Sequence, residues 1–160
     1  MMHRLIKITA ILGIAAGATY GIGLQSQYVA PVGALRPGES IAVDFVSTGC
    51  FSSTHYNFEI GAGKKPLVSA QTFKLGKPEP VELGKLTLSP ADVAGLNRLF
   101  QMYRTLPKGG CTTVDTITLT QMRGDKEIAT ERFVDRTCSY ERKDVLRFTE
   151  LIQRLRRPVE

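Results

Sequence analysis

The sequence predicts an α+β protein, with an antiparallel sheet of about five to six strands and two helices packed on one face. Two observations predict it. Short runs of alternating or β-branched residues recur between turn signals, as in strands, whereas two other segments repeat apolar residues at the 3.6-residue spacing of a helix. The connections are short, which favours antiparallel neighbours and places both helices on the same face.

Four strands are expected before residue 89, where apolar side chains alternate with small or polar ones and Gly or Pro marks the intervening turns. They are Ile41–Phe45, Tyr56–Ile60, Leu67–Phe73 and Val81–Leu88. A helix should follow, because Ser89 can cap it, Pro90 suits its first position and Asp92 completes a capping pattern. Its apolar stripe is predicted to be core and consists of Val93, Leu96, Leu99, Phe100 and Tyr103.

The stretch from Cys111 to Cys138 predicts a hairpin stapled by a disulfide. Its strands are expected at 112–122 and 127–134, joined by a two-residue turn at Gly124 and Asp125. If Arg123 faces Lys126, the numbers of facing residues add to 249, which also pairs the two cysteines; a single β-bulge can intervene. Such a disulfide would stabilise the fold by about 3–4 kcal/mol on the chain-entropy model. The core side of the hairpin is expected to carry Ile117, Leu119, Ile128 and Val134; the alternative is the opposite face, which carries Val114, Met122, Ala129 and Phe133.

After the hairpin, Ser139 is expected to cap a final helix that Pro158 ends. Its apolar positions are Val145, Phe148, Leu151, Ile152 and Leu155. The arginines near its end are interpreted as a solvated terminus, where cations suit the helix dipole; they are Arg154, Arg156 and Arg157.

The first residues have the composition of a targeting segment. A basic start precedes an apolar stretch that ends in Ala16-Gly17-Ala18, the pattern of a signal-peptidase site. We therefore expect a signal peptide at 1–18, or an uncleaved anchor to about residue 24, then a linker at 19–39 and one globular domain at 40–157. Export to the periplasm or the medium agrees with the predicted disulfide, since disulfides persist outside the cytosol. A membrane is a partner only if the N-terminal segment is retained.

Charge and composition exclude several function classes. The formal net charge is +6, but the basic residues are spread and form no stripe with interleaved aromatics, so a nucleic-acid partner is not expected. The chain has two histidines and no metal-ligand spacing, so neither a metal nor another cofactor is expected. The hairpin carboxylates alternate with cations and are interpreted as solvated or cross-strand pairs; they are Asp115, Glu127, Glu131 and Asp135.

Cys50 remains once the hairpin cysteines pair. It is interpreted as a small buried thiol; the alternative is a thiol nucleophile with His55 as base and Asp44 as the acceptor that orients it. A binding surface around this loop is the candidate site, and its residues are Cys50, Phe51, His55 and Tyr56.

No catalytic motif accompanies these residues, so we do not expect an enzyme. The leading hypothesis is an exported, non-enzymatic domain that binds another macromolecule, such as an envelope component or a secreted enzyme that it inhibits. The alternatives are a thiol-dependent enzyme that uses Cys50 and His55, and a membrane-anchored structural protein of the envelope.

Overall fold

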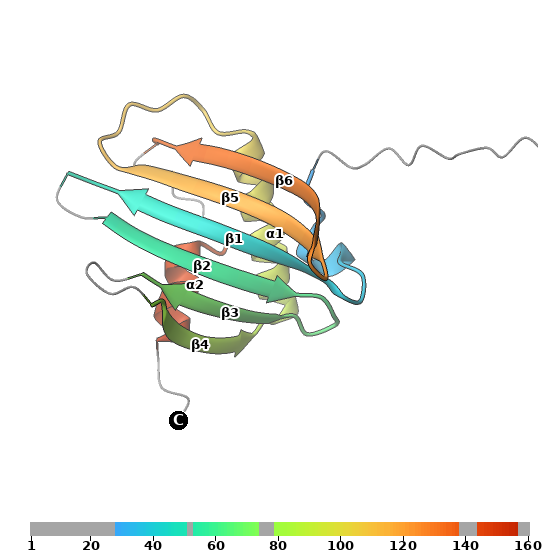
Figure 1. The fold of residues 1–160 in the computed structure, drawn as a ribbon. Coiled ribbons are helices and arrows are strands. Elements are labelled where there is room, and N and C mark those ends of the chain that lie inside the picture. The colour runs from blue at the N-terminus through green and yellow to red at the C-terminus, as the bar shows by residue number, and fades with distance from the viewer. Residues whose placement is uncertain (1–27, 51–52, 74–78, 138–143, 157–160) are drawn as a thin grey trace, which may run out of the picture.

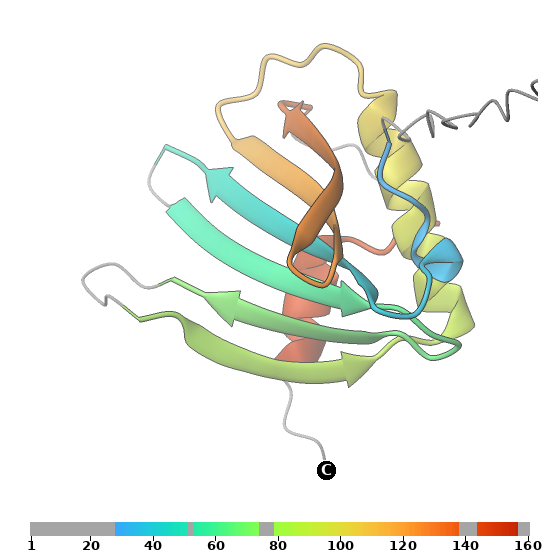
Figure 2. The same ribbon diagram turned by 45° about the vertical axis from the view of Figure 1, so that its right-hand side comes forward.

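The computed structural model describes residues 28–50, 53–73, 79–137 and 144–156. In these ranges six strands form one antiparallel sheet in the order β4-β3-β2-β1-β5-β6. Helices α1 (Pro90–Arg104) and α2 (Phe148–Leu155) lie on one side of the sheet (Figures 1 and 2), which confirms the predicted α+β architecture. The strands are β1 (Glu39–Thr48), β2 (Ser53–Gly61), β3 (Leu67–Thr72), β4 (Val81–Thr87), β5 (Val114–Arg123) and β6 (Lys126–Asp135).

Helix α1 begins as its sequence predicts. The backbone N–H of Asp92 donates to the Ser89 hydroxyl, and the Ser89 backbone N–H donates to the Asp92 carboxylate, which completes a capping box with Pro90 at the first position. The predicted stripe faces the sheet: Leu96 and Leu99 are fully buried, along with Phe100. Local sequence therefore determines both the start and the buried face of this helix.

The β5–β6 hairpin has the predicted turn but a different register beyond it. Gly124 has a φ of 56°, and Arg123 pairs with Lys126, as the two-residue loop requires. The register then shifts between Gln121 and Met122, so that Gln121 faces Ala129 and one residue of β6, Ile128, is extra. From there to the end of the ladder, facing numbers add to 250 in place of the predicted 249.

The shift reverses which side of β6 is buried. A one-residue change of register moves every following side chain to the other face. Ile117 and Leu119 are buried as expected, but they face the half-buried Phe133 and the buried Glu131 of β6, whereas Val134 is 47% exposed. The assignment of Val134 to the core was wrong for this reason. Cys138 lies outside the described residues, so its disulfide with Cys111 stays a prediction.

Helix α2 starts later than its apolar pattern predicts. Arg147 is at its N-cap position and the helix begins at Phe148, so Ser139, which lies outside the described residues, is not the cap of this element. Val145 and Leu146 are buried but precede the helix. Apolar spacing located the buried side chains correctly, and the start was wrong because residues that precede a helix can also reach the core.

Two of the arginines expected to be solvated make specific contacts. Arg154 holds the Asp92 carboxylate through two hydrogen bonds, of 2.7 and 3.0 Å. Arg156 donates to the Tyr56 hydroxyl at 3.1 Å and lies over its ring. The end of α2 is thus tied to both the start of α1 and the sheet. Arg157 lies outside the described residues.

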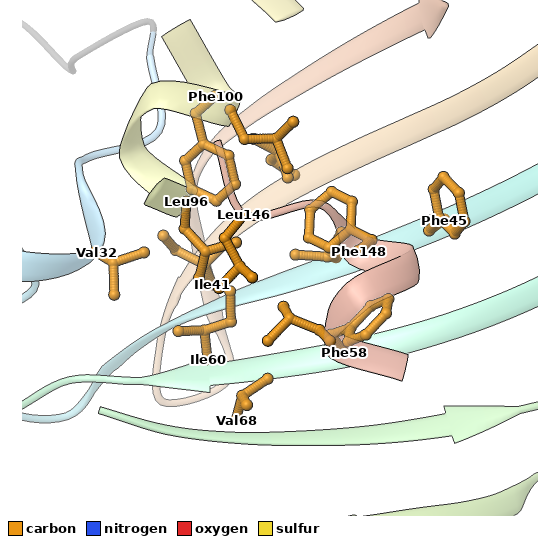
Figure 3. Close-up of a cluster of buried hydrophobic side chains, with 14 of the residues drawn as sticks. Val32, Ile41, Phe45, Phe58, Ile60, Val68, Leu96, Phe100, Leu146 and Phe148 are labelled. Atoms are coloured by element: carbon orange, nitrogen blue, oxygen red, sulfur yellow. The ribbon is translucent and has the colours of Figure 1, made fainter. Parts of the chain in front are cut away.

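The core lies between the sheet and the two helices (Figure 3). Ile41 and Ile60 project from the sheet towards Leu96 of α1. Phe148 of α2 packs against two sheet aromatics, with ring centroids 5.2 Å from that of Phe58 and 5.7 Å from that of Phe45. These contacts join all the main elements in one core.

The packed structure begins before residue 40, where the domain was expected to start. Val29, Val32 and Leu35 are buried in the core, although the sequence here has no periodicity. Side chains of the sheet satisfy the backbone of this segment: the N–H of Val29 donates to Glu131 at 2.8 Å and the N–H of Ala30 donates to Gln121 at 2.9 Å. Residues 28–36 therefore form a strap along α1, which includes the short 3-10 helix η1 (Val32–Ala34).

Within the ranges that the structure describes, no helix combines the length and hydropathy needed to span a membrane. The predicted signal peptide or anchor lies outside these ranges.

Candidate binding surfaces at one end of the sheet

The structure does not bring the described residues of the expected binding surface together. Cys50 is an exposed free cysteine in the loop between β1 and β2, so the expectation that it is buried was wrong. Phe51 lies outside the described residues. His55 and Tyr56 are neighbours in β2 and therefore point to opposite faces of the sheet. Tyr56 is buried on the helix side.

His55 lies on the side of the sheet that carries no helix, called here the open face. Its Nε2 is hydrogen-bonded to Oδ1 of Asp44, the acceptor that the thiol hypothesis had assigned to it. Its ring stacks on Phe73, with 4.4 Å between ring centroids and 21° between planes. The last pair of β1 and β2 joins Thr48 to Ser53, so His55 stands two residues back from the Cys50 loop, roughly 7 Å along the strand. The imidazole–carboxylate pair thus forms within the sheet, away from the loop of the thiol.

Separate exposed apolar side chains stand on the open face. Among the described residues, four large hydrophobic side chains are exposed, and three of them project from this face: Leu67 (46%), Phe73 (37%) and Val134 (47%). The fourth, Tyr28, belongs to the strap on the other side. On this face β5 presents Thr116, Thr118 and Thr120, whereas the central strands β1 and β2 present polar side chains that include Asp44 and His55.

A cavity of about 190 Å³ lies on the helix side of the sheet, between the strands and the helices. It is at the end of the sheet where the loop of Cys50 joins β1 to β2. Two carboxylates line it from the sheet, since Asp115 and Asp135 are direct partners in the last pair of the β5–β6 ladder. Tyr103 of α1 and Arg147, at the start of α2, line the helix side. Like charges that face each other across two strands are destabilising, so this pair needs compensation.

The two carboxylates are compensated unequally. Asp135 accepts hydrogen bonds from the backbone N–H and the hydroxyl of Thr137, at 2.8 and 2.7 Å. Asp115 accepts a hydrogen bond from Ser47, but its Oδ1 is buried and has no donor among the described residues. Burial and the charge of Asp135 raise the pKa of Asp115 above its ordinary value, although the Ser47 hydrogen bond opposes this.

The same carboxylates also shift the pKa of Tyr103. Burial is the main cause that raises the pKa of its hydroxyl, and the carboxylates of Asp115 and Asp135 raise it further, while Arg147 has the opposite effect. The phenol therefore stays protonated and can both donate and accept a hydrogen bond inside the cavity. Its ring stacks on that of Phe148, 6.4 Å away, which fixes the position of the hydroxyl.

Sequence analysis missed the cavity because its acidic residues were interpreted as solvated pairs with neighbouring cations. Asp115 and Asp135 face each other only in the bulged register, where facing numbers add to 250. Without the bulge, Asp115 would face position 134. The available signal was therefore the bulge, which the sequence of the hairpin does not locate.

Neither the part of the chain that the structure describes nor the comparisons extend this geometry to a known site. No group of three or more His, Cys, Asp or Glu side chains in the described ranges is arranged to hold a metal ion. Comparison with protein-family models, curated proteins and solved structures found no match. The open face and the cavity are consequently the two candidate sites of function.

Proposed function

We propose that this protein is an exported, non-enzymatic domain that binds another macromolecule, such as an envelope component or a secreted enzyme that it inhibits, through the open face of its sheet. The observation that carries the proposal is the placement of three of the four exposed large hydrophobic side chains of the described residues on that face. These side chains are spread over the face, since Leu67 and Phe73 stand six residues apart along β3, roughly 20 Å, so the face would offer separate apolar contacts to a large partner.

The dimensions of the open face suit a macromolecule. Phe73 follows β3 and Val134 belongs to β6, and these strands are four positions apart in the sheet, or roughly 19 Å. With strands of up to ten residues, roughly 33 Å long, the face covers roughly 600 Å², which is comparable with the roughly 800 Å² that each partner buries in a standard protein interface. Its two middle strands, β1 and β2, carry the polar side chains Asp44, His55 and Glu59, whereas threonines line β5. The Asp44–His55 pair beside Phe73 adds polar groups next to the apolar ones.

Site-specific crosslinking in the exporting cell tests this proposal. A photoreactive residue would replace Phe73 in one variant and Val134 in another; a third variant would carry it at Tyr28, which is also exposed but lies off the open face. We expect the two open-face variants to give the same adduct and the Tyr28 variant to give none. An adduct at Tyr28 alone, or different adducts at the two open-face positions, would contradict the proposal.

The disulfide between Cys111 and Cys138 is part of the proposal, because it indicates an oxidising compartment. The backbone N–H of Cys111 donates to the carbonyl oxygen of Arg136 at 3.0 Å, which holds Cys111 beside the chain two residues before Cys138. Disulfides need Cα atoms roughly 4.4–6.8 Å apart, a distance that two residues can span. Cys50 is exposed at the tip of another hairpin.

A non-reducing peptide map of the protein recovered from the exporting cell tests the pairing. We expect one linked peptide that contains Cys111 and Cys138, and alkylation of Cys50 without denaturant. A link from Cys50 to either of the other cysteines would refute it. The mass of the same product shows whether the chain is cleaved after Ala18.

A further inference from the structure

We infer that the cavity between the sheet and the helices is a binding site for a primary alkylammonium group, with the charged end held by Asp115 and Asp135 and the alkyl stem held by the aromatic wall. This site is separate from the open face, because side chains that line it point to the helix side of the sheet. The inference therefore does not depend on the macromolecular partner proposed above.

The charges of the cavity call for a cation. Its lining contains two carboxylates, Asp115 and Asp135, and one guanidinium, Arg147, so the formal charges of these groups sum to one negative charge. Oδ1 of Asp115 is buried and has no donor within the described residues. A buried acceptor without a donor is destabilising, and a donor on a bound ligand would relieve this. An ammonium group supplies three donors and a positive charge at one point.

The walls of the cavity select the shape of the ligand. Phe45 and Phe148 line it from the sheet and from α2, and Met102 lines it from α1. All three side chains are buried, so the interior beside the carboxylates is apolar. A short alkyl chain can lie along such a surface while its ammonium end reaches the acidic pair, as lysine stems do elsewhere.

The volume of the cavity limits the size of the ligand. The volume of about 190 Å³ is below the roughly 300–1,000 Å³ of pockets that take drug-sized ligands. It suits an ammonium group with a few methylenes. A bare Ca²⁺ ion prefers about 6–8 oxygen ligands, more than two carboxylates and a phenol provide. The ammonium can belong to a free small amine or to a lysine side chain of a protein, and the chemistry of the site is the same for both.

Titration of the full-length exported protein tests the inference, with chemical shifts of the Tyr103 and Phe148 rings as the readout. The probes are n-butylammonium chloride, its uncharged counterpart 1-butanol, and a lysine-containing peptide beside its norleucine analogue, all at fixed ionic strength. We expect saturable shifts with butylammonium and none with 1-butanol. Equal affinity for butylammonium and the lysine peptide indicates a free amine as the ligand. If the lysine peptide binds more than tenfold more tightly than butylammonium and its norleucine analogue does not bind, the ligand is a lysine side chain.

Two matched variants make the result specific. Asp115→Asn should weaken butylammonium at least tenfold, and Asp44→Asn, which removes a carboxylate from the open face, should leave its affinity unchanged. Asp115→Asn should also unfold at the same or a higher temperature without ligand, because it removes one of two facing like charges. Equal response to butylammonium and 1-butanol, no response to either, or equal effects of the two variants would overturn the inference.

Discussion

The ion pair between Arg154 and Asp92 should make the stability of the protein depend on pH in the acid range. Arg154 is in the last turn of α2 and Asp92 in the first turn of α1, so the pair joins the two helices. Its two parallel hydrogen bonds, of 2.7 and 3.0 Å, match the fork of a guanidinium to a carboxylate. Only 14% of the Asp92 side chain is exposed, against 34% for Arg154.

The size of the pH-dependent stabilisation follows from the pKa of Asp92. The hydrogen bond from Arg154 is the largest of the causes that lower the pKa of Asp92 from 3.8 to about 2, despite its partial burial. A pKa that is lower in the folded state stabilises the protein above the unfolded value, and this stability is lost as the pH falls through the folded value. The difference corresponds to roughly 2.5 kcal/mol at about 1.4 kcal/mol per pKa unit. Solvent screening at the partly exposed Arg154 reduces the share of the pair to about 1–2 kcal/mol.

The test is urea unfolding of wild type and Arg154→Met across the acid range, since methionine keeps an apolar stem but no charge. We expect the variant to be less stable by about 1–2 kcal/mol near neutral pH, and the difference to shrink below about pH 3 as Asp92 is protonated. Arg98→Met is the control: Arg98 pairs with Asp144 where both are about half exposed, so its loss should stay within about 0.5 kcal/mol. A difference between wild type and Arg154→Met that is independent of pH would refute the reasoning.

Two further predictions concern the loop between α1 and β5 and the contact between the strap and β6. Gly109→Ala would place a Cβ 2.1 Å from a backbone carbonyl oxygen, whereas the Cβ of Gly110→Ala would meet no atom within 4 Å. Thermal unfolding should show a loss of about 1–3 kcal/mol for the first and about 0.5 kcal/mol or less for the second, and similar losses would contradict this packing. Glu131→Ala removes the buried partner of Arg104 and the acceptor of the Val29 N–H, and should cost about 3–5 kcal/mol. Hydrogen exchange at Val29 should then accelerate, and unchanged protection would show that the strap does not depend on Glu131.

Elements whose signals are local could be predicted from the sequence. The start of α1 depends on Ser89, Pro90 and Asp92, which are adjacent in the chain and complete one another's hydrogen bonds. The hairpin turn depends on Gly124 and its positive φ. In both cases a few neighbouring residues determine the geometry whatever the rest of the fold does.

Features that depend on distant partners could not be predicted in this way. The strap at 28–36 has no periodicity, and it is ordered by acceptors about 90–100 positions away, on Gln121 and Glu131. The contact between Arg154 and Asp92 likewise spans 62 positions. Cys50 is exposed because the β1–β2 ladder ends at Thr48 and Ser53. No residue type near this point predicts where the ladder ends.

The extra residue in β6, Ile128, is the physical link between the two proposed surfaces. Without it, the predicted register would place Asp115 opposite position 134, turn Val134 towards the helices and put Phe133 and Asp135 on the open face. The observed bulge gives the open face its apolar Val134 and gives the cavity its second carboxylate, in one step. It also creates a facing pair of like charges at a half-buried site, which local rules disfavour. Residues that break a local rule without full compensation are found mainly at functional sites, and Asp115 and Asp135 fit that description because one of their oxygens still lacks a donor among the described residues.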